Sequence, residues 1–594
     1  MVRQHVVVQY DLTTQKFRRL LLRKRHAFLS DAERMCLRIY EEALDSGARS
    51  KEEVLNSGQA ESFLLGYLEK LESNIRMIAE KHDVPGMLLQ ARRLRPQALR
   101  GRYKGTSWNI LRTLTLAILK YGNIRLPSSV RKTLSGGKAE MITEVTHRSV
   151  ADTVKLLLLC DAHYSATCSL RYVRKGASLL LDKDHPLARP EEDLRRAVEF
   201  YDFRLENARC SLFDHAGLLH DIGFPRMSGE PFMFCCGPNE DEEEEGLRLQ
   251  DESLEIELPP PNYYPGLISL KRFPEYGHLF SSSLRSTYNC EPEQLFNLIR
   301  LLCAWLLIDF REEAPAKLYQ YSQRGLSVGT YSALRGNLPQ LIKWSESMLI
   351  GGAKGISADL AMRLLEDFSI CPEKQQDNID LVRWEPKYAL YLGDDFFIID
   401  LLAIGEFIGG ILWKTQLTDT ERNIKGSKFE DELLTYVLNA SPSVSQVFSP
   451  RKKLKLRGRL RAEIDLSLAK NSTCFLIDCK SYSISAALFE GQRQAVLNRW
   501  NTNIDWVRDN DGRASFLADN PIGDNYRLPM ECLYVVPIVC TTYPEFLFDV
   551  SDRMLLSGDI PRVCTPKELT EFLDSFREPE LTSRSYTRKV LAHS

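Results

Sequence analysis

Apolar and polar positions repeat with different periods along this chain, and the change of period divides the sequence. From residue 30 to about 229, apolar residues recur every three to four positions, as in 32–44, which predicts a helix-dominated amino-terminal half. Residues 1–10 alternate instead and predict a short strand. Beyond about residue 421 the pattern predicts a helix, a strand hairpin, a second helix and a further strand, which is typical of an α/β domain.

This pattern predicts a multidomain protein. Residues 1–236 form a mainly helical amino-terminal region, and 267–420 form a middle α+β region with helices and short strands. Between them, 237–266 carries an acidic run and three consecutive prolines, which indicate a linker or a long surface loop. An acidic mimic that occupies a basic groove is the alternative for this segment.

The carboxy-terminal part, 421–577, is expected to be an α/β domain with a central mixed sheet flanked by helices, followed by a tail at 578–594. A chain of 594 residues is too long for one ordinary core, which agrees with several domains.

Composition narrows the class of protein. With 44% hydrophobic and 27% charged residues, the chain has the composition of a folded globular protein. Its apolar runs, such as 301–308, are shorter than the roughly 20 residues of a membrane span. Fourteen cysteines without C-x-x-C pairs indicate reduced thiols. We therefore expect a cytoplasmic protein without a membrane partner. Because the net charge is only −2, a nucleic-acid partner must be sought in local patches.

Candidate chemistry is concentrated in two neighbouring strands of the predicted α/β domain. In the first, 461–468, apolar residues share one face and Asp465 lies on the other. The second, 473–480, is apolar until Asp478 and Lys480, which a period of two places on one face. A hairpin between these strands brings Asp465 opposite Asp478, so that the two carboxylates converge.

Two converging acids are suited to a hard divalent cation. Oxygen ligands from Asp465 and Asp478, helped by the backbone carbonyl of Cys479, fit Mg²⁺ or Mn²⁺. The metal lowers the pKa of a water molecule, and the ammonium group of Lys480 orients that water or stabilises developing phosphoryl charge. An amphipathic helix that opens at G-S-K-F-E delivers Glu430 to the same cluster.

Four features occur in order: G-S-K-F-E at 426–430, E-I-D at 463–465, D-C-K at 478–480, and then a helix that carries Gln492 and Gln494. Together they resemble the PD-(D/E)XK nuclease superfamily, especially its Holliday-junction-resolvase-like and type IV restriction branches. The resemblance covers about a quarter of the chain. It implies a restriction-endonuclease-like fold and a Mg²⁺- or Mn²⁺-dependent endonuclease that hydrolyses phosphodiester bonds, with DNA favoured over RNA.

The resemblance also implies a role for each matching residue. Glu430 is similar to the acid of the first helix, Asp465 to the first metal-ligating aspartate, Asp478 to the second acid and Lys480 to the catalytic lysine. Gln494, or Gln492, is similar to the glutamine that often follows the core motif. Two departures exist: no proline precedes the first aspartate, and an aspartate stands where glutamate is commoner. Neither removes a ligand.

A dense run of positive charge precedes the first acidic strand. Its members are Arg451, Lys452, Lys453, Lys455, Arg457, Arg459 and Arg461. Phosphate contact explains this density best, and such contacts fix position without reading bases. Two tryptophans on the following helix, Trp500 and Trp506, are interpreted as core residues rather than as base-stacking residues.

Two further functions stay open. A non-catalytic nucleic-acid-binding or assembly protein would keep the nuclease fold for its basic surface. The dipeptide His220-Asp221 resembles HD-type phosphohydrolases, although the sequence offers no clear distant aspartate. Under the nuclease hypothesis, the amino-terminal half acts as a sensor or regulator that binds a protein partner or a second copy, and a restriction or anti-phage defence role follows by analogy.

Overall fold

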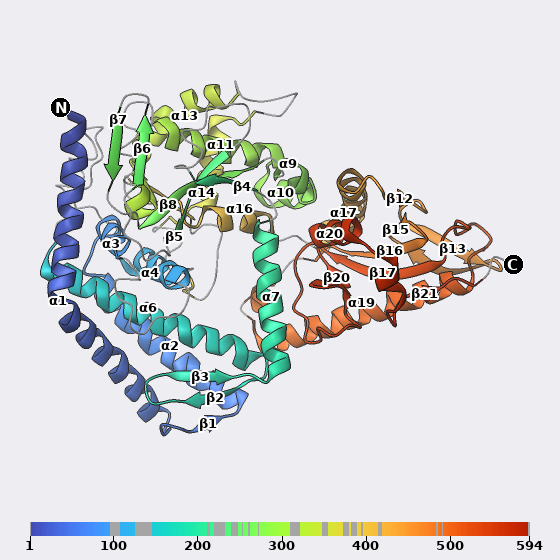
Figure 1. Cartoon of the computed structure of the whole chain (residues 1–594), viewed down its shortest axis with the longest axis horizontal. Helices are drawn as coiled ribbons and strands as arrows, with labels where there is room; N and C mark the ends of the chain where they lie inside the picture. The colour runs from blue at the N-terminus through green and yellow to red at the C-terminus, as the bar shows by residue number, and fades with distance from the viewer. Residues whose placement is uncertain are drawn as a thin grey trace. The chain divides into compact units, whose positions relative to one another are not determined.

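The structure, a computed structural model, describes the chain in segments. These are residues 2–94, 107–124, 145–210, 214–218, 232–238, 247–251, 254–258, 262–270, 273–308, 321–346, 355–371, 379–381, 389–393, 396–413, 419–482, 485–489 and 491–591. The chain divides into two compact units, each assembled from three stretches of sequence (Figure 1). The first comprises Met1–Arg189, Phe213–Lys271 and Glu293–Gly410, and the second comprises Pro190–Leu212, Arg272–Pro292 and Ile411–Ser594.

Long helices build the first part of unit one. They are α1 (Val2–Ser46), α2 (Ser57–Ala79), α3 (Val84–Ala91), α4 (Ser107–Tyr121) and α6 (His147–Arg174). A small sheet joins them, with the order β1 (Val54–Leu55), β2 (Ser178–Leu181), β3 (Pro186–Arg189). The helical character predicted for this region is confirmed. The strand predicted at 1–10 is wrong, because these residues belong to α1, in which neither glycine nor proline interrupts the helix.

The rest of unit one contains both strands and helices. One sheet has the order β4 (Asp214–Leu218), β8 (Tyr263–Ser269), β5 (Phe232–Pro238), and another has the order β10 (Leu390–Leu392), β11 (Phe397–Asp400), β9 (Leu326–Gly329). A separate hairpin pairs β6 (Leu247–Asp251) with β7 (Leu254–Leu258). The helices are α11 (Pro292–Ile308), α13 (Tyr331–Glu346), α14 (Ala358–Phe368) and α16 (Ile404–Trp413).

The linker predicted at 237–266 is replaced by regular structure wherever the segment is described. Tyr263 begins the central strand β8 and is only 1% exposed. The hairpin β6–β7 occupies much of the remainder. The acidic run at 240–245 and the prolines at 259–261 lie outside the described residues.

One carboxylate of unit one, Glu72 on α2, is surrounded by donors from α4 and α6. Its oxygens accept hydrogen bonds from Tyr121 Oη at 2.6 Å and Lys120 Nζ at 3.2 Å, and His163 Nε2 lies 3.3 Å away. Burial raises the pKa of Glu72, but the hydrogen bonds from His163 and Tyr121 and the charge of Lys120 outweigh it and lower that pKa to about 2.

This lowered pKa predicts how stability depends on pH. A depressed carboxylate pKa stabilises the folded state above the unfolded pKa of about 4.5, and this contribution is lost as pH falls toward 2. We expect Glu72→Gln to lower the free energy of unfolding by roughly 2 kcal/mol at pH 7, and the difference from wild type to shrink below pH 4.5. Urea unfolding across pH 3–7 measures this. The exposed Glu42→Gln serves as a control, and a pH-independent difference would contradict the expectation.

The second unit is built on a mixed sheet with the strand order β12-β15-β16-β17-β20, in which β21 also pairs with β17. The strands are β12 (Ser445–Gln446), β15 (Leu466–Lys470), β16 (Thr473–Lys480), β17 (Tyr534–Thr541), β20 (Val563–Cys564) and β21 (Arg588–Lys589). Strands β15 and β16 are antiparallel, whereas β16, β17 and β20 run parallel. The predicted mixed sheet is therefore confirmed.

Helices flank this sheet. They are α17 (Asp419–Ala440), α18 (Ala486–Phe489), α19 (Arg493–Asp519), α20 (Pro566–Ser575) and α21 (Glu578–Thr582). The unit also contains α7 (Glu192–Cys210), α9 (Phe273–His278) and α10 (Ser281–Tyr288). Two hairpins complete the unit: β13 (Lys452–Leu456) with β14 (Arg459–Ile464), and β18 (Leu555–Ser557) with β19 (Ile560–Pro561).

The sheet separates α19 from α17 and α20 (Figure 1). Cys474 and Leu476 of β16 belong to one hydrophobic cluster with Ala514 of α19. Phe475 points the other way and packs edge-to-face on Phe572 of α20. Because side chains alternate along a strand, the later even-numbered residues of β16 also face α19.

Two predicted boundaries differ from the structure. The expected tail is part of the fold, since β21 pairs with β17 and Tyr586 is only 2% exposed. Helix α7, expected within the amino-terminal region, belongs to unit two. Its buried Arg204 donates hydrogen bonds to the carboxylate of Glu568 and to the carbonyls of Glu545 and Val563.

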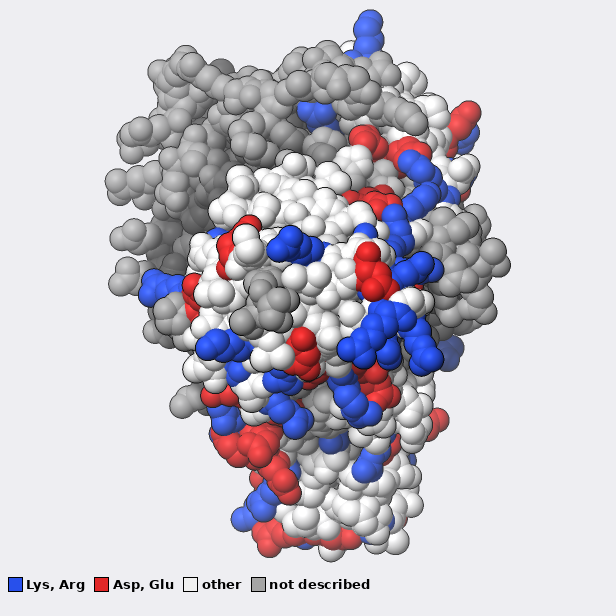
Figure 2. Space-filling view, turned by 90° about the vertical axis from the view of Figure 1, so that its right-hand side faces the viewer, with Lys and Arg blue, Asp and Glu red and all other residues white. Residues whose placement is uncertain are grey.

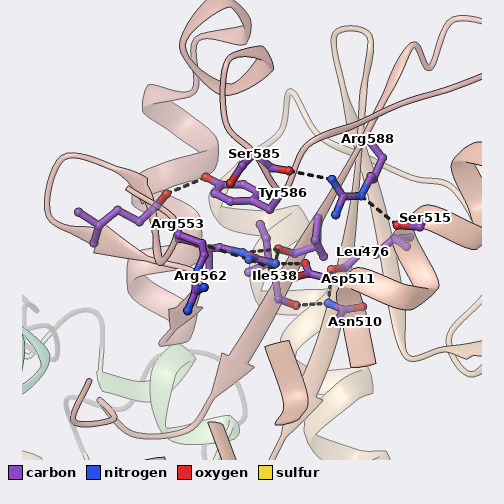
Figure 3. Close-up of polar contacts among 12 residues, drawn as sticks. Leu476, Asn510, Asp511, Ser515, Ile538, Arg553, Arg562, Ser585, Tyr586 and Arg588 are labelled. Atoms are coloured by element: carbon purple, nitrogen blue, oxygen red, sulfur yellow. Dashed lines mark hydrogen bonds and ion pairs between the residues drawn. The ribbon is translucent and has the colours of Figure 1, made fainter. Parts of the chain in front are cut away.

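Polar contacts fix α19 on the sheet (Figure 3). Asn510 Nδ2 donates to the carbonyls of Leu476, at 3.0 Å, and Ile538, at 2.8 Å, so it joins two parallel strands. Arg562 is ion-paired with Asp511 of the same helix. Because the buried side chain of Asn510, on α19, contacts both β16 and β17, it fixes the helix relative to these two strands.

Arg562 is expected to be a major determinant of stability. It is 2% exposed, and its guanidinium lies 4.2 Å from the ring centroid of Tyr586. Arg562→Ala leaves Asp511 without its ion-pair partner, so we expect a loss of about 3–5 kcal/mol in the free energy of unfolding. Arg553→Ala is the matched control, because that side chain is 67% exposed and should matter by less than about 0.5 kcal/mol. Equal effects in urea unfolding would refute the assignment.

Candidate active site

Asp465 lies at a break between two strands. Strand β14 ends at Ile464 and β15 begins at Leu466, and the two strands belong to different sheets. Ile464 packs in the cluster on the α19 side, whereas Leu466 pairs with Ile477 in the main sheet. The predicted single strand 461–468 is therefore two strands, and the change of direction occurs at Asp465.

The predicted hairpin between the acidic strands is confirmed. Asn471, with φ of +55°, lies in the turn that joins β15 to β16. The antiparallel register pairs Leu466 with Ile477. Continued by one residue, this register sets Asp465 opposite Asp478, as the sequence predicts.

Asp478 is a buried carboxylate, 2% exposed, held between two cations. Its Oδ2 lies 2.8 Å from Lys480 Nζ, and its Oδ1 accepts a hydrogen bond from Arg513 Nη1 at 2.6 Å. Arg513, on α19, is absent from the sequence-based site. The one feature that could have indicated Arg513 as a site residue is its place beside the buried Ala514, on the sheet-facing side of the helix. A charge on the buried face of a helix needs a partner.

Asp465 faces this arrangement from the other strand. Its Oδ2 accepts a hydrogen bond from the backbone amide of Cys479 at 2.9 Å. Burial, together with the negative charge of Asp478, raises the pKa of Asp465 to about 7, although the Cys479 amide and Lys480 act in the opposite direction. The two carboxylates are thus close enough to repel each other. Cys479 contributes its amide, while a ligand role for its carbonyl stays a prediction.

Glu430 approaches from α17. Burial raises its pKa, and its own charge contributes to the raised pKa of Asp465. Its Oε2 lies 3.1 Å from Arg451 Nη1, and the same guanidinium contacts Asp431 at 2.9 Å. The backbone amide of Arg451 also donates to the carbonyl of Asp465 at 3.0 Å. Arg451 therefore joins α17 to the bend, and its predicted phosphate contact stays a prediction.

The structure does not bring Gln494 to the carboxylates. Its side chain is exposed and donates to Asn498 at 2.7 Å. Nineteen residues of the same helix separate Gln494 from Arg513, which corresponds to about 28 Å along the axis. Gln492 directly precedes α19 and is also exposed. Gln494 lies in the first turn of α19, whereas Arg513, which contacts Asp478, lies near the other end of the helix. Gln494 is therefore too far along the helix to reach the carboxylates.

The donor set is suited to a metal that takes few protein ligands. Across the described segments, no group of three or more His, Cys, Asp or Glu side chains is arranged to hold a metal ion. Mg²⁺ is commonly held by one or two carboxylates, with water and substrate phosphates as further ligands. Asp465 and Asp478 supply two carboxylates, and a cation would relieve the repulsion that raises the pKa of Asp465.

The HD-type alternative has little structural basis. Residues 214–218, which include His215, form strand β4, whereas that site needs histidines and aspartates on helices. His220 and Asp221 lie outside the described residues.

The other predicted basic residues gather on the hairpin β13–β14, which we call the basic arm. Its exposed members are Lys453, Lys455, Arg457, Arg459 and Arg461, and Lys452 is partly buried. None of the six forms an ion pair with another described residue. Figure 2, which views the molecule from the side on which β13 is drawn in Figure 1, shows groups of Lys and Arg side chains on this face, with Asp and Glu side chains among them.

The basic arm is held by neutral and acidic contacts to its backbone. Asp524 accepts hydrogen bonds from the amides of Arg457, at 3.1 Å, and Gly458, at 2.7 Å. Asn525 Oδ1 accepts from the amide of Lys455 at 2.8 Å. Because these contacts use backbone groups, the cationic side chains remain available to solvent.

Comparison with protein-family models, with curated proteins and with solved structures returned no match. Within the described residues, no helix combines the length and the apolar character that crossing a bilayer requires.

Proposed function

We propose that this protein is a metal-dependent nuclease that hydrolyses phosphodiester bonds in DNA. The observation that carries the proposal is the convergence of two acids at the end of β16: Asp465 Oδ2 accepts a hydrogen bond from the Cys479 amide at 2.9 Å, and the adjacent Asp478 lies 2.8 Å from Lys480 Nζ. The order helix α17, hairpin β15–β16, helix α19 and parallel strand β17 also agrees with the resemblance found in the sequence.

Asp465 and Asp478, with Glu430 nearby, are the residues that would hold Mg²⁺ or Mn²⁺. When bound, the metal polarises the phosphoryl group and lowers the pKa of a coordinated water. Lys480 is 20% exposed at its side chain, so its ammonium group can contact a phosphate oxygen and stabilise the charge that develops there. Arg513 positions Asp478 through its hydrogen bond.

The basic arm would hold the nucleic-acid backbone. Six positive charges without described acidic partners lie on a hairpin whose second strand leads directly into Asp465. Phosphate contacts give affinity and register without sequence specificity. Every residue of this proposed site belongs to unit two. Unit one would then serve as the sensor or regulator, through a protein partner or a second copy, in a restriction or anti-phage defence role.

A second candidate function is supported by one observation. Both oxygens of Asp478 are already engaged, one by Arg513 and the other by Lys480. Such a network can be purely structural. In that case the protein binds nucleic acid through the basic arm and does not hydrolyse it.

Cleavage of supercoiled plasmid and linear DNA by the full-length protein distinguishes the nuclease function from the binding function. The nuclease predicts products in Mg²⁺ or Mn²⁺ and none in EDTA. Calorimetric titration with Mn²⁺ provides a second readout that is independent of any trigger. Wild-type protein that binds DNA but neither cleaves it nor takes up Mn²⁺ would favour the binding function and refute the nuclease.

A further inference from the structure

We propose that Tyr482 is a stacking platform for an unpaired base of the DNA, beside the cleavage site. This proposal rests on the proposed nuclease function and names its substrate class: single-stranded, overhanging or branched DNA. Tyr482 follows Lys480 by two residues, beyond the end of β16. It is 47% exposed, although it is a large aromatic residue.

The ring of Tyr482 is supported from one side. It stacks on Trp506 of α19, with ring centroids 5.1 Å apart and an interplanar angle of 27°. The guanidinium carbon of Arg499 lies 5.1 Å from the Tyr482 centroid and 5.2 Å from the Trp506 centroid. Three nearly equal separations form a triangle. Arg499 therefore lies beside the stacked pair and does not cover the outer face of Tyr482.

The support behind Tyr482 is rigid. Trp506 is 9% exposed and belongs to a hydrophobic cluster with Val539 of the central strand β17. Arg499 Nε donates to Glu545 Oε2 at 2.8 Å, and the Glu545 side chain is 4% exposed. An aromatic ring that is fixed from behind and open in front loses little conformational entropy when a base stacks on it. The exposed ring thus has the form of a binding surface.

The position of Tyr482 relates it to the carboxylates. Trp506 supports Tyr482, and Arg513 holds Asp478, from the same helix. Seven residues of α19 separate them, which is about 10 Å along the axis. This offset along α19 between Trp506 and Arg513 equals the length of about three stacked nucleotides at 3.4 Å each. An intact duplex buries the faces of its internal bases inside the stack, so only an unpaired or terminal base can stack on the ring of Tyr482.

The test uses full-length protein in EDTA, so that hydrolysis plays no part. The probe is a single-stranded oligodeoxynucleotide that contains 2-aminopurine, whose fluorescence falls when it stacks. We expect quenching by wild type and by Tyr482→Phe, which keeps the ring, and little quenching by Tyr482→Ala. We also expect Tyr482→Ala to bind this probe roughly tenfold more weakly. Binding of a relaxed, covalently closed duplex circle, which offers neither an unpaired nor a terminal base, should be unchanged in all three proteins.

Met530→Ala is the matched control, because Met530 is 65% exposed in the same unit. It should behave as wild type. Unchanged quenching in Tyr482→Ala overturns the platform, and so does an equal loss of duplex binding. If quenching depends on Tyr482 but the protein never cleaves DNA, the stacking platform is supported and the nuclease function is refuted. Absence of any DNA binding by wild type overturns both.

Discussion

Asp478→Asn is expected to reduce metal-dependent DNA cleavage by roughly a thousandfold or more. The substitution keeps the shape of the side chain but removes the negative charge that would hold the metal. Asp465→Asn should act in the same direction. Lys480→Ala should also abolish cleavage, although it leaves both acids in place to take up Mn²⁺. Cleavage of supercoiled plasmid in Mg²⁺ measures activity, and calorimetry with Mn²⁺ measures uptake.

Stability must be controlled in this experiment, because Asp478 is buried between Lys480 and Arg513. Removing its charge leaves two cations without their partner, and a loss of stability follows. Thermal unfolding of each variant identifies proteins that are folded at the assay temperature. Asp505→Asn is the matched control, since Asp505 is 61% exposed on α19. Wild-type cleavage by folded Asp478→Asn would show that the active site lies elsewhere.

The sequence predicted the parts of this site that depend on short stretches of chain. The hairpin β15–β16 joins residues only a few positions apart, so alternation and a turn at Asn471 were enough to oppose Asp465 and Asp478. Glu430 was also identified correctly as a neighbour, since the pKa of Asp465 responds to its charge. Local periodicity carries this information because strand and helix geometry are fixed by the backbone.

Contacts between distant stretches were not predictable in this way. Arg513 lies 35 residues from Asp478, and Arg204 lies 364 residues from Glu568. No periodic pattern connects such pairs. The expectation for Gln494 failed for a related reason: the sequence showed a helix but not where α19 crosses the sheet. Residues near the other end of this helix are the ones that reach β16.

Neutralising part of the basic arm is expected to change how DNA binding depends on salt. Each phosphate contact contributes about 0.9 to the slope of log K against log salt concentration. If Lys453, Lys455 and Arg459 each contact a phosphate, their combined replacement by alanine lowers the slope by about 2.7. With equal binding near 1 M salt, this difference corresponds to roughly 500-fold weaker binding at 0.1 M. Fluorescence anisotropy in EDTA between 0.05 and 0.3 M NaCl measures the slope.

The control for this experiment removes charge of the same sign from the same unit. Arg508 and Arg553 are 72% and 67% exposed, and each is paired with a nearby aspartate. Their double replacement by alanine should leave the slope almost unchanged, because their charge is already compensated. The loss in the basic-arm variant should be uniform across DNA sequences, since phosphate contacts read no bases. An equal change of slope in both variants would show that general surface charge, and not the arm, binds the DNA.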